Sequence, residues 1–407
     1  MTTRGAVIAG GGIGGLTAAL CLAEQGWDVR VLEQASAFGP VGAGIQISPN
    51  ATRVLYSLGL EEALKRHAFL PDGIEIRSYR RGHILGQAEL GESTRAQFGF
   101  PSLHIHRADL HEVLAEAAND HPRVEIELSC GVTEIRSEPE RETAITSDGR
   151  TYEASLVVGA DGIKSAVRES LFGPEAPRFT GCVAYRGLVP AKLLRDADVR
   201  PVATNWLGPK RHFVHYYLRR GDLVNFVACV EEDGWEIESW TEPAEKAELK
   251  TRFAGWHPTV QAIINASDTE SLFRWAIFDR DPMQAWSRGA TTLLGDACHP
   301  MPPFMAQGGC MAIEDAAVLV GCLERDADIA HALPRYEALR RPRTARIQEG
   351  SRANMDLYHM SGPRALARNV AMRVAGQSLA RRAAALYTYD ALHAAHNSPD
   401  PSPGPVT

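Results

Sequence analysis

The sequence predicts an α/β fold in which a domain built on a parallel sheet is interrupted by an antiparallel sheet and followed by a helical C-terminus. Three short apolar runs, at residues 6–9, 154–159 and 290–294, each end in a turn containing glycine or aspartate and lead into a helical pattern. Such runs are typical of buried parallel strands. Between residues 180 and 282, several segments alternate apolar and polar residues, which is typical of antiparallel strands with one covered face.

The composition is that of an ordinary globular chain. Its 407 residues are 44% hydrophobic and 23% charged, which allows two or three domains. The net charge of −7 argues against broad nucleic-acid binding. Seven scattered cysteines without a CxxC pair predict neither a disulfide framework nor a metal site, and they favour the cytoplasm. No apolar run is long enough to span a membrane. Residues 1–9 could mimic a signal peptide, but they are needed for the first strand and turn.

The first strand–turn–helix unit carries a glycine fingerprint. Gly10, Gly12 and Gly15 fit the pattern G-x-G-x-x-G, and Gly14 lies in the same turn. Glu33 ends the next strand, where its carboxylate can accept from both ribose hydroxyls of an adenosine. In this context the pattern predicts an ADP-containing ligand, with its pyrophosphate at the helix N-terminus. The alternative is a glycine-rich turn without a ligand.

Two later strand ends should meet the same ligand. Asp161 and Asp296 follow the second and third apolar strands, so with Gly10 they should gather at one carboxyl edge of the sheet. Asp296 could accept from a polyol. Gly308 and Gly309 would point the next helix N-terminus at the same ligand. A ligand that meets a pyrophosphate turn at one end and a helix N-terminus at the other is long.

The two styles of sequence divide the chain into discontinuous domains. The assigned parts are a Rossmann-like nucleotide-binding domain at 1–73, 101–178 and 287–345, a β-rich substrate domain at 74–100 and 179–286, C-terminal helices at 346–396, and a disordered tail at 397–407.

In this order and spacing, the three junctions resemble the motifs of the single-component FAD-dependent aromatic hydroxylases. The resemblance covers nearly the whole chain and is greatest to the branch of salicylate hydroxylase, 3-hydroxybenzoate 6-hydroxylase and 6-hydroxynicotinate 3-monooxygenase. The motifs that carry it are Gly10-x-Gly12-x-x-Gly15, Ala160-Asp161-Gly162, and the segment 295–309, which begins Gly295-Asp296.

The resemblance implies a role in FAD binding for each predicted site residue. The glycine turn and Glu33 would hold the ADP half, and Arg107 would lie near the pyrophosphate or the flavin. Asp161 would help with the pyrophosphate and NAD(P)H, and Asp296 would bind the ribityl chain. The helix that starts at Gly308 and Gly309 would face the flavin N1–C2=O edge, where a helix N-terminus stabilises the anionic reduced flavin.

The implied activity is hydroxylation of a phenolic or hydroxypyridine aromatic, expected to bear a carboxylate, with NAD(P)H and O2 as co-substrates and a flavin C4a-hydroperoxide as oxygen donor. No membrane or nucleic acid is expected as a partner, and the helical C-terminus would suit a homodimer. The choice between NADH and NADPH stays open. Two alternatives remain: an FAD-dependent reductase or dehydrogenase that inserts no oxygen, and a nucleotide-binding regulatory protein that uses only the first motif.

The segment 212–218 of the β-rich domain supplies the candidate catalytic residues. Alternation along the strand places His215 and Tyr217 on one face, together with Phe213. The resemblance matches His215 and Tyr217 to a pair over the substrate, where a neutral imidazole could take the phenol proton. The alternative is a packed core histidine. Gln307 could bond a substrate carboxylate or hydroxyl, or it could only cap its loop.

Overall fold

A computed structural model describes residues 4–39, 42–138, 141–232, 242–374 and 378–397. The fold is mixed α/β, as the sequence predicts. Its first sheet has the strand order β18-β19-β11-β1-β2-β7. These strands are β1 (Gly5–Ala9), β2 (Asp28–Leu32), β7 (Val124–Glu127), β11 (Leu156–Gly159), β18 (Ser287–Arg288) and β19 (Thr291–Leu293).

The three predicted apolar strands are neighbours in this sheet. β11 lies between β1 and β19, and both pairings are parallel. β2 and β7 continue the parallel sheet, and only β18 is antiparallel to its neighbour. The carboxyl ends of β1, β11 and β19 therefore lie side by side, as the predicted nucleotide site requires.

The second sheet has eight strands in the order β16-β17-β12-β15-β14-β13-β4-β5. It joins β4 and β5, from the first predicted β-rich segment, to the strands of the second. Most pairings are antiparallel, as expected, but β13 and β4 are parallel. The strands are β4 (Gly73–Ser78), β5 (Ile84–Glu89), β12 (Arg178–Pro190), β13 (Val202–Gly208), β14 (Arg211–Leu218), β15 (Leu223–Glu231), β16 (Glu242–Pro243) and β17 (Phe273–Asp279).

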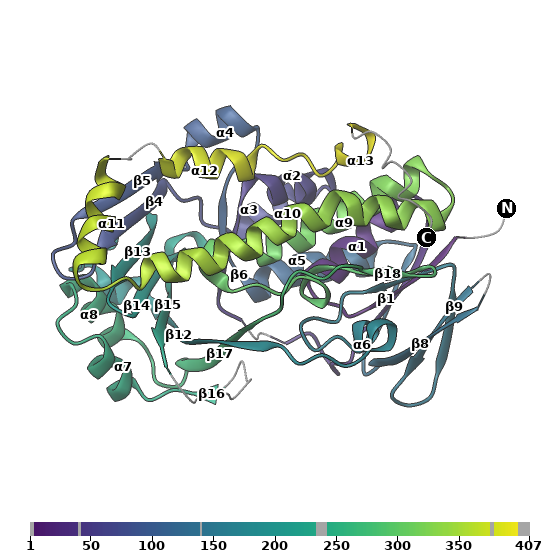
Figure 1. Cartoon of the computed structure of the whole chain (residues 1–407), viewed down its shortest axis with the longest axis horizontal. Helices are drawn as coiled ribbons and strands as arrows, with labels where there is room; N and C mark the ends of the chain where they lie inside the picture. The colour runs from purple at the N-terminus through teal and green to yellow at the C-terminus, as the bar shows by residue number, and fades with distance from the viewer. Residues whose placement is uncertain (1–3, 40–41, 139–140, 233–241, 375–377, 398–407) are drawn as a thin grey trace.

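Helices cover the sheets and join the two halves of the molecule (Figure 1). Two smaller sheets complete the fold: β3 (Gly44–Ile47) with β6 (Leu103–His106), and β8 (Val132–Glu138), β9 (Arg141–Thr146) and β10 (Thr151–Ala154). The helices are α1 (Ile13–Glu24), α2 (Pro49–Ser57), α3 (Glu61–His67), α4 (Glu92–Phe98), α5 (Arg107–Asp120), α6 (Ala166–Phe172), α7 (Lys246–Arg252), α8 (Pro258–Ala266), α9 (Gly308–Arg325), α10 (Ile329–Tyr358), α11 (Gly362–Val374), α12 (Ser378–Tyr387) and α13 (Ala394–Asn397).

The long helix α10 runs lengthwise across the molecule and links its two halves (Figure 1). It crosses the predicted boundary at residue 345 without a break, so that position is not the end of an element. The C-terminal helices α11 and α12 follow it, and residues 398–407 of the predicted tail lie outside the described residues. No described helix combines the length and apolarity that crossing a membrane would need.

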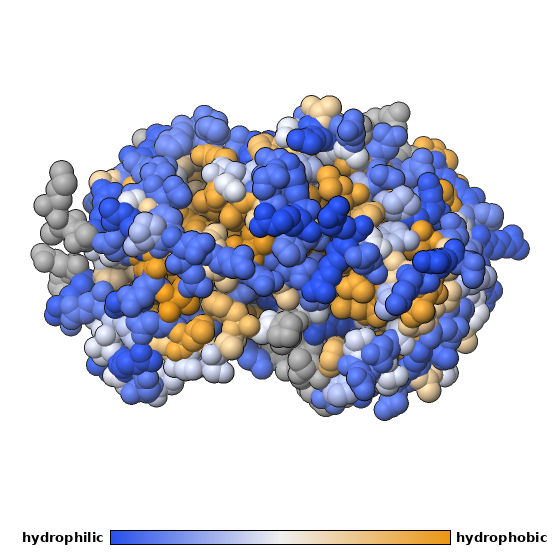
Figure 2. Space-filling view, turned by 180° about the vertical axis from the view of Figure 1, so that it is seen from behind, coloured by the Kyte–Doolittle hydropathy of each residue, from blue (hydrophilic) through white to orange (hydrophobic). Residues whose placement is uncertain are grey.

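The eight-stranded sheet has two differently covered faces. On its back face, large apolar side chains such as Phe213 and Phe226 pack in one cluster with Leu249 of α7 and Val260 of α8. Its front face turns toward the half of the molecule that holds the first sheet, where Tyr216 lies against His104 of β6 with ring centroids 4.7 Å apart. Figure 2 shows the molecule from behind, with hydrophobic residues in the recesses between hydrophilic ones.

Candidate active site

The glycine turn between β1 and α1 is built for a ligand. Gly10 has φ +102°, and a Cβ there would lie 2.5 Å from the carbonyl oxygen of Ala160. A Cβ at Gly15 would collide with the carbonyl oxygen of Gly10. Gly12 caps α1 without a side-chain hydrogen bond and faces open space. The first N–H groups of α1 are therefore available to an anion, as a pyrophosphate requires.

Gly14 packs tightly against other elements on one side. A Cβ at this position would lie 2.6 Å from Leu294 and 3.1 Å from Ala312. Its side of α1 therefore packs against the end of β19 and against α9. Its N–H is one of the first N–H groups of α1, so its predicted contact with the ligand stays a prediction.

Glu33 lies at the end of β2 beside the glycine turn, as predicted. Its Oε2 accepts from the Gly11 N–H at 2.7 Å, and its Oε1 accepts from the Ala35 N–H at 2.8 Å. These two bonds hold the carboxylate next to the turn. This is the position from which a carboxylate reaches a ribose.

Asp161 and Asp296 lie at the ends of the neighbouring strands β11 and β19. Asp161 accepts from the Val167 N–H through Oδ2, while its buried Oδ1 has no hydrogen-bond partner within the described part of the chain. Burial raises the pKa of Asp296, although His299 and Arg107 act to lower it. Asp296 is nevertheless exposed to solvent. Asp296 can therefore be reached by a ligand at the end of β19, and Arg107 is close enough to act on its pKa.

The N-terminus of α9 faces the loop that carries β3. Helix α9 begins at Gly308, and its N-cap residue, Gln307, makes no side-chain cap. A Cβ at Gly309 would lie 2.7 Å from Ile45 of β3. Because no side chain caps α9, its first N–H groups are available to a ligand.

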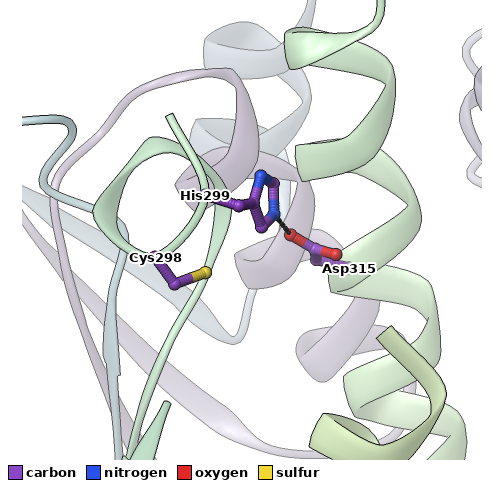
Figure 3. Close-up of side chains that lie close together, drawn as sticks. All are labelled: Cys298, His299 and Asp315. Carbon is purple, nitrogen blue, oxygen red and sulfur yellow. Dashed lines mark hydrogen bonds and ion pairs between the residues drawn. The ribbon is translucent and has the colours of Figure 1, made fainter. Parts of the chain in front are cut away.

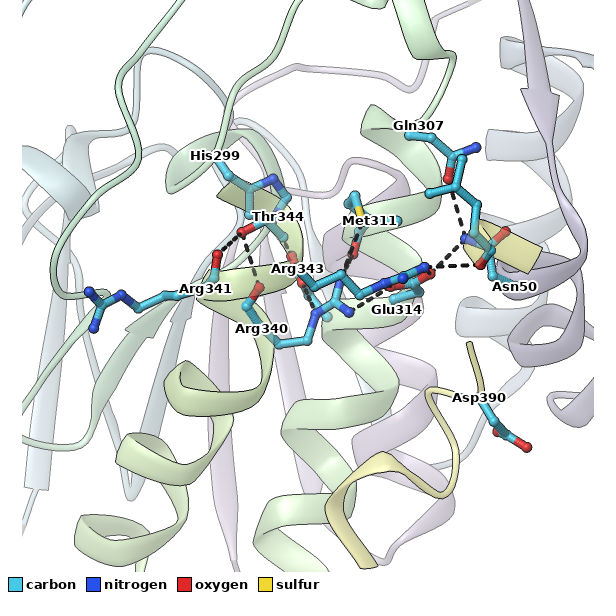
Figure 4. A network of polar contacts seen from close by, with 12 residues as sticks. Asn50, His299, Gln307, Met311, Glu314, Arg340, Arg341, Arg343, Thr344 and Asp390 are labelled. Atoms are coloured by element: carbon cyan, nitrogen blue, oxygen red, sulfur yellow. Dashed lines mark hydrogen bonds and ion pairs between the residues drawn. The ribbon is translucent and has the colours of Figure 1, made fainter. Parts of the chain in front are cut away.

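Gln307 does not reach the substrate side of the loop. Its side chain is 4% exposed, and its Nε2 donates to Ser48 Oγ at 3.0 Å. Its Oε1 accepts from Asn50 Nδ2 at 3.3 Å. Both ends of the amide are thus bound to the segment that begins α2 (Figure 4). The predicted contact of Gln307 with the substrate is therefore wrong. Its side chain instead links the start of α9 to the start of α2.

A buried ion-pair network between α10 and α9 holds the start of α9 in place (Figure 4). Arg340 of α10 donates to Glu314 and to Asp315, each at 2.6 Å, and all three side chains have no exposed area. Arg343 adds a second bond to Glu314 at 2.7 Å. Glu314 also accepts from Asn50 Nδ2 at 2.6 Å. The charges are balanced, as buried ions require.

Cys298, His299 and Asp315 lie close enough together to resemble a metal site (Figure 3). His299 Nε2 and Asp315 Oδ2 are 2.5 Å apart. Asp315 also accepts from the Gly295 N–H at 3.1 Å, and from Arg340. Burial would raise the pKa of Asp315, but His299 and Arg340 lower it to about 2. Its oxygens are already engaged, so the cluster holds the turn that precedes Asp296.

His215 and Tyr217 of β14 lie on the back face of the sheet. His215 is 1% exposed, and its Nδ1 accepts from Trp206 Nε1 at 3.2 Å. The predicted role of His215 over the substrate is therefore wrong, because the cluster under α7 and α8 covers this part of the face. Tyr217 packs against Phe69 with ring centroids 5.3 Å apart and donates to the Val199 carbonyl, so its hydroxyl is already bonded within the protein.

The opposite face of β14 carries His212 and Tyr216. The His212 ring is 2% exposed and lies between Phe304 and Tyr358, with centroids 5.2 and 5.3 Å away. Its Nδ1 is 2.7 Å from His359 Nε2. Its Nε2 has no hydrogen-bond partner among the described residues. Period-2 alternation identified this pair of faces, but it could not tell which face meets the flavin.

Two polar side chains, from strands β13 and β12, share the front face with His212. They lie at the two ends of one row across the sheet. In this row Asn205 pairs with Val214, Val214 pairs with Val227, and Val227 pairs with Arg186. Asn205 Oδ1 is buried without a hydrogen-bond partner in the part of the chain that the structure describes. Arg186 is 5% exposed, and burial and Arg107 lower its pKa to about 10. This row lies between the rows of His212 and Tyr216.

Comparisons with known proteins identify the family of this chain. A family model described as an FAD binding domain matches residues 3–351. A 3-amino-4-hydroxybenzoate 2-monooxygenase of Streptomyces platensis is 42% identical over 370 residues, covering 90% of this chain and 92% of the relative. A 3-hydroxybenzoate 6-hydroxylase of Klebsiella oxytoca is 40% identical over 380 residues, covering 92% and 93%.

The chain belongs to the FAD-dependent aromatic monooxygenases. HpxO of Klebsiella pneumoniae, solved with FAD and uric acid, superposes on this monooxygenase with a TM-score of 0.84 and 28% identity, covering 94% of this chain and 96% of HpxO. The enzyme uses NAD(P)H and O2 to hydroxylate an aromatic substrate. The alternatives of a reductase without oxygen insertion and of a regulatory protein are therefore set aside.

The donor set of this monooxygenase fits FAD. The uncapped α1 N-terminus suits the pyrophosphate, Glu33 suits the ribose, and Asp296 at the end of β19 suits the ribityl hydroxyls. The uncapped α9 N-terminus suits the electron-rich edge of the ring. The orphaned Oδ1 of Asp161 indicates that a donor from outside the protein completes this site.

Replacing Gly15 by alanine should produce a monooxygenase that purifies with little or no FAD. The added methyl group would collide with the Gly10 carbonyl and displace the turn that meets the pyrophosphate. The flavin absorbance per protein and FAD titration calorimetry measure the effect, and we expect a loss of affinity of at least about tenfold. Gly5→Ala is the matched control, because a Cβ at Gly5 meets nothing within 4 Å. Equal FAD content in the two variants would contradict the assignment.

Proposed function

We propose that the substrate is a phenolic or hydroxypyridine aromatic acid, bound between the front face of the second sheet and the flavin, and that His212 takes its hydroxyl proton. The observation that carries this proposal is the arrangement of the His212 ring. One nitrogen, Nδ1, is anchored on His359, and the structure gives the other nitrogen no hydrogen bond among the described residues. Such a neutral imidazole is the usual general base for a phenol.

Ionising the substrate is the step in which this chain takes part directly. When bound, FAD accepts hydride from NAD(P)H and activates O2 for electrophilic transfer to the ring. A phenolate ring is a far better nucleophile than a phenol ring. Burial and the neighbouring His359 hold the pKa of His212 well below its usual value, so the base is unprotonated at neutral pH. The rings of Phe304 and Tyr358 exclude water from this side of the base.

A carboxylate on the substrate would be met by arginine. Arg186 lies on the front face with its guanidinium 5.5 Å from the ring centroids of Phe273 and of Trp275. Arg107 is close enough to lower its pKa. These two neighbouring cations lie where the second sheet meets the predicted cofactor site, and together they favour an anionic ligand. Along the same row of the sheet, Val214 and Val227 lie between Arg186 and Asn205 and offer apolar side chains to an aromatic ring.

The substrate class is tested by oxidation of NADH and of NADPH with hydroxybenzoates, hydroxypyridines and the matching phenols that lack a carboxylate. Oxygen uptake and peroxide are recorded together. We expect one aromatic acid to stimulate oxidation of the coenzyme with little peroxide. Stimulation with stoichiometric peroxide would show a mimic of the substrate, and stimulation only by phenols without a carboxylate would contradict the proposed class.

In Arg186→Gln, we expect the KM for the best aromatic acid to rise about 10- to 100-fold, because a charge-assisted bond is lost. The KM for the matching phenol without a carboxylate should change little, and this pair of substrates is the internal control. An equal rise in the KM for both substrates would contradict a contact between Arg186 and the substrate carboxylate.

The assembly and location are proposals of the same kind. We infer a homodimer through the C-terminal helices, supported by the exposed apolar side chains Leu366, Val370 and Val374 on successive turns of α11. Light scattering of the purified protein tests this. We infer a cytoplasmic location from seven cysteines that are all buried and unbridged.

A further inference from the structure

A chain of three side chains leads from the front face of the second sheet to the protein surface. His212 Nδ1 lies 2.7 Å from His359 Nε2, and His359 Nδ1 lies 3.0 Å from Glu231 Oε1. His212 and His359 are 2% and 4% exposed, whereas the Glu231 side chain is 36% exposed. The chain therefore begins at the proposed substrate and ends in water.

The three residues come from separate elements that the backbone holds together. His212 lies on β14, Glu231 ends β15, and His359 caps the C-terminus of α10. The Lys210 N–H donates to the His359 carbonyl at 2.9 Å, and the Lys210 carbonyl accepts from the Glu231 N–H at 2.9 Å. The turn at Lys210 thus fixes the end of α10 against both strands.

The carboxylate decides which nitrogen of each ring carries the proton. An ionised glutamate can only accept, so His359 must donate to it from Nδ1. The other nitrogen of neutral His359, Nε2, is then an acceptor, and His212 must donate to it from Nδ1. The Nε2 of neutral His212 is then left with a lone pair. This is the tautomer that a general base requires.

The charged groups around the chain keep both rings neutral at rest. Burial, Arg211 and Arg368 lower the pKa of His359 to about 4. Burial and His359 lower the pKa of His212. Glu231 is the acidic group that faces the rings, and Phe304 and Tyr358 supply only apolar ring surface. The C-terminus of α10 favours a passing positive charge on His359.

We infer that Glu231 and His359 form a relay that fixes the tautomer of His212 and conducts the substrate proton to solvent. The inference rests on the proposed function, since it needs His212 to be the base. The phenol O–H bond breaks as a bond to hydrogen forms at His212 Nε2. The Nδ1 proton of His212 passes to His359 Nε2, and the Nδ1 proton of His359 passes to Glu231 and then to water. Return of one proton along the same path resets the relay.

The tautomer of His212 tests the relay without any substrate. Histidine is labelled with ¹⁵N in the FAD-loaded wild type and in the variants Glu231→Gln and His359→Gln, with His215→Gln as control. In the wild type we expect protonated Nδ1 and unprotonated Nε2 on His212. Both relay variants should shift this ring toward the other tautomer, and His215→Gln should leave it unchanged. An unshifted His212 in both relay variants would overturn the inference.

The turnover rate of the variants shows whether His359 passes on a proton or only holds the His212 ring in place. Glutamine at position 359 can still hold the His212 ring by a hydrogen bond, but it cannot pass a proton on. With the aromatic acid that gives the highest coupled turnover, we expect kcat of His359→Gln to fall about 10- to 100-fold at unchanged KM and unchanged rate of flavin reduction. Turnover near the wild-type value would overturn the relay. His212→Gln tells the two failures apart: if it is also fully active, the proposed base is wrong as well.

Discussion

His212→Gln should lower aromatic hydroxylation by about 10²- to 10⁴-fold, the usual contribution of a general base. Glutamine keeps a hydrogen-bonding group toward His359 but has no lone pair of sufficient basicity to ionise a phenol. Reduction of the flavin by NAD(P)H does not need that proton, so consumption of coenzyme should continue and oxygen should appear as peroxide. The measurement is the ratio of hydroxylated product to peroxide in the variant.

His215→Gln is the matched control for this experiment. It replaces a histidine of the same strand, equally buried, whose pKa burial and Arg77 lower to about 3. Its side chain lies on the covered back face, where Nδ1 accepts from Trp206. We expect unchanged coupling in this variant. Coupled turnover in His212→Gln together with uncoupling in His215→Gln would reverse the assignment made from the fold.

The pH dependence follows from the direction of the His212 shift. A base whose pKa is lowered stays unprotonated to a more acidic pH than an ordinary histidine. The acidic limb of kcat should therefore lie below the usual histidine value of about 6.5. A limb at or above that value would mean that another group controls the reaction.

The cofactor half of the site could be predicted from the sequence because its signals are local. A glycine turn, its strand and its helix occupy one short stretch, and Gly10, Gly15 and Glu33 lie where that stretch places them. The pattern does not show, however, which side of α1 packs at Gly14. That side is decided by Leu294 and Ala312, which lie far away in the chain.

The substrate half could be predicted only in part, since alternation gives two faces without saying what covers each. The amphipathic segment around Leu249 and the bulky Phe213 were the available signal, because a helix with an apolar face must cover one side of the sheet. That signal assigns Phe213, and with it His215, to the covered side. The hydrogen-bond partners of Gln307 and His212 could not be predicted from the sequence, because Asn50 and His359 lie 257 and 147 residues away from them in the chain.

Arg340→Met should cause the largest loss of stability, about 3–5 kcal/mol, because it leaves buried Asp315 without its arginine partner and removes one of the two arginines that bind buried Glu314. Burial alone would lower the pKa of Arg340, but Glu314 and Asp315 raise it well above its usual value, so the charge is fixed. Urea unfolding of the FAD-free protein measures the effect. Arg341→Met is the control on the same helix: Arg341 is 33% exposed and lies 3.7 Å from Glu337, so about 1 kcal/mol or less is expected.

The same substitution should weaken FAD binding although Arg340 is on neither predicted cofactor turn. Asp315 accepts from the Gly295 N–H, which precedes Asp296, and Glu314 is tied through Asn50 to the residue before α9. Releasing the two carboxylates therefore loosens both ends of the flavin site at once. FAD titration should show a higher Kd for Arg340→Met than for Arg341→Met. If the two variants unfold at the same urea concentration and bind FAD equally, the network is not what positions α9.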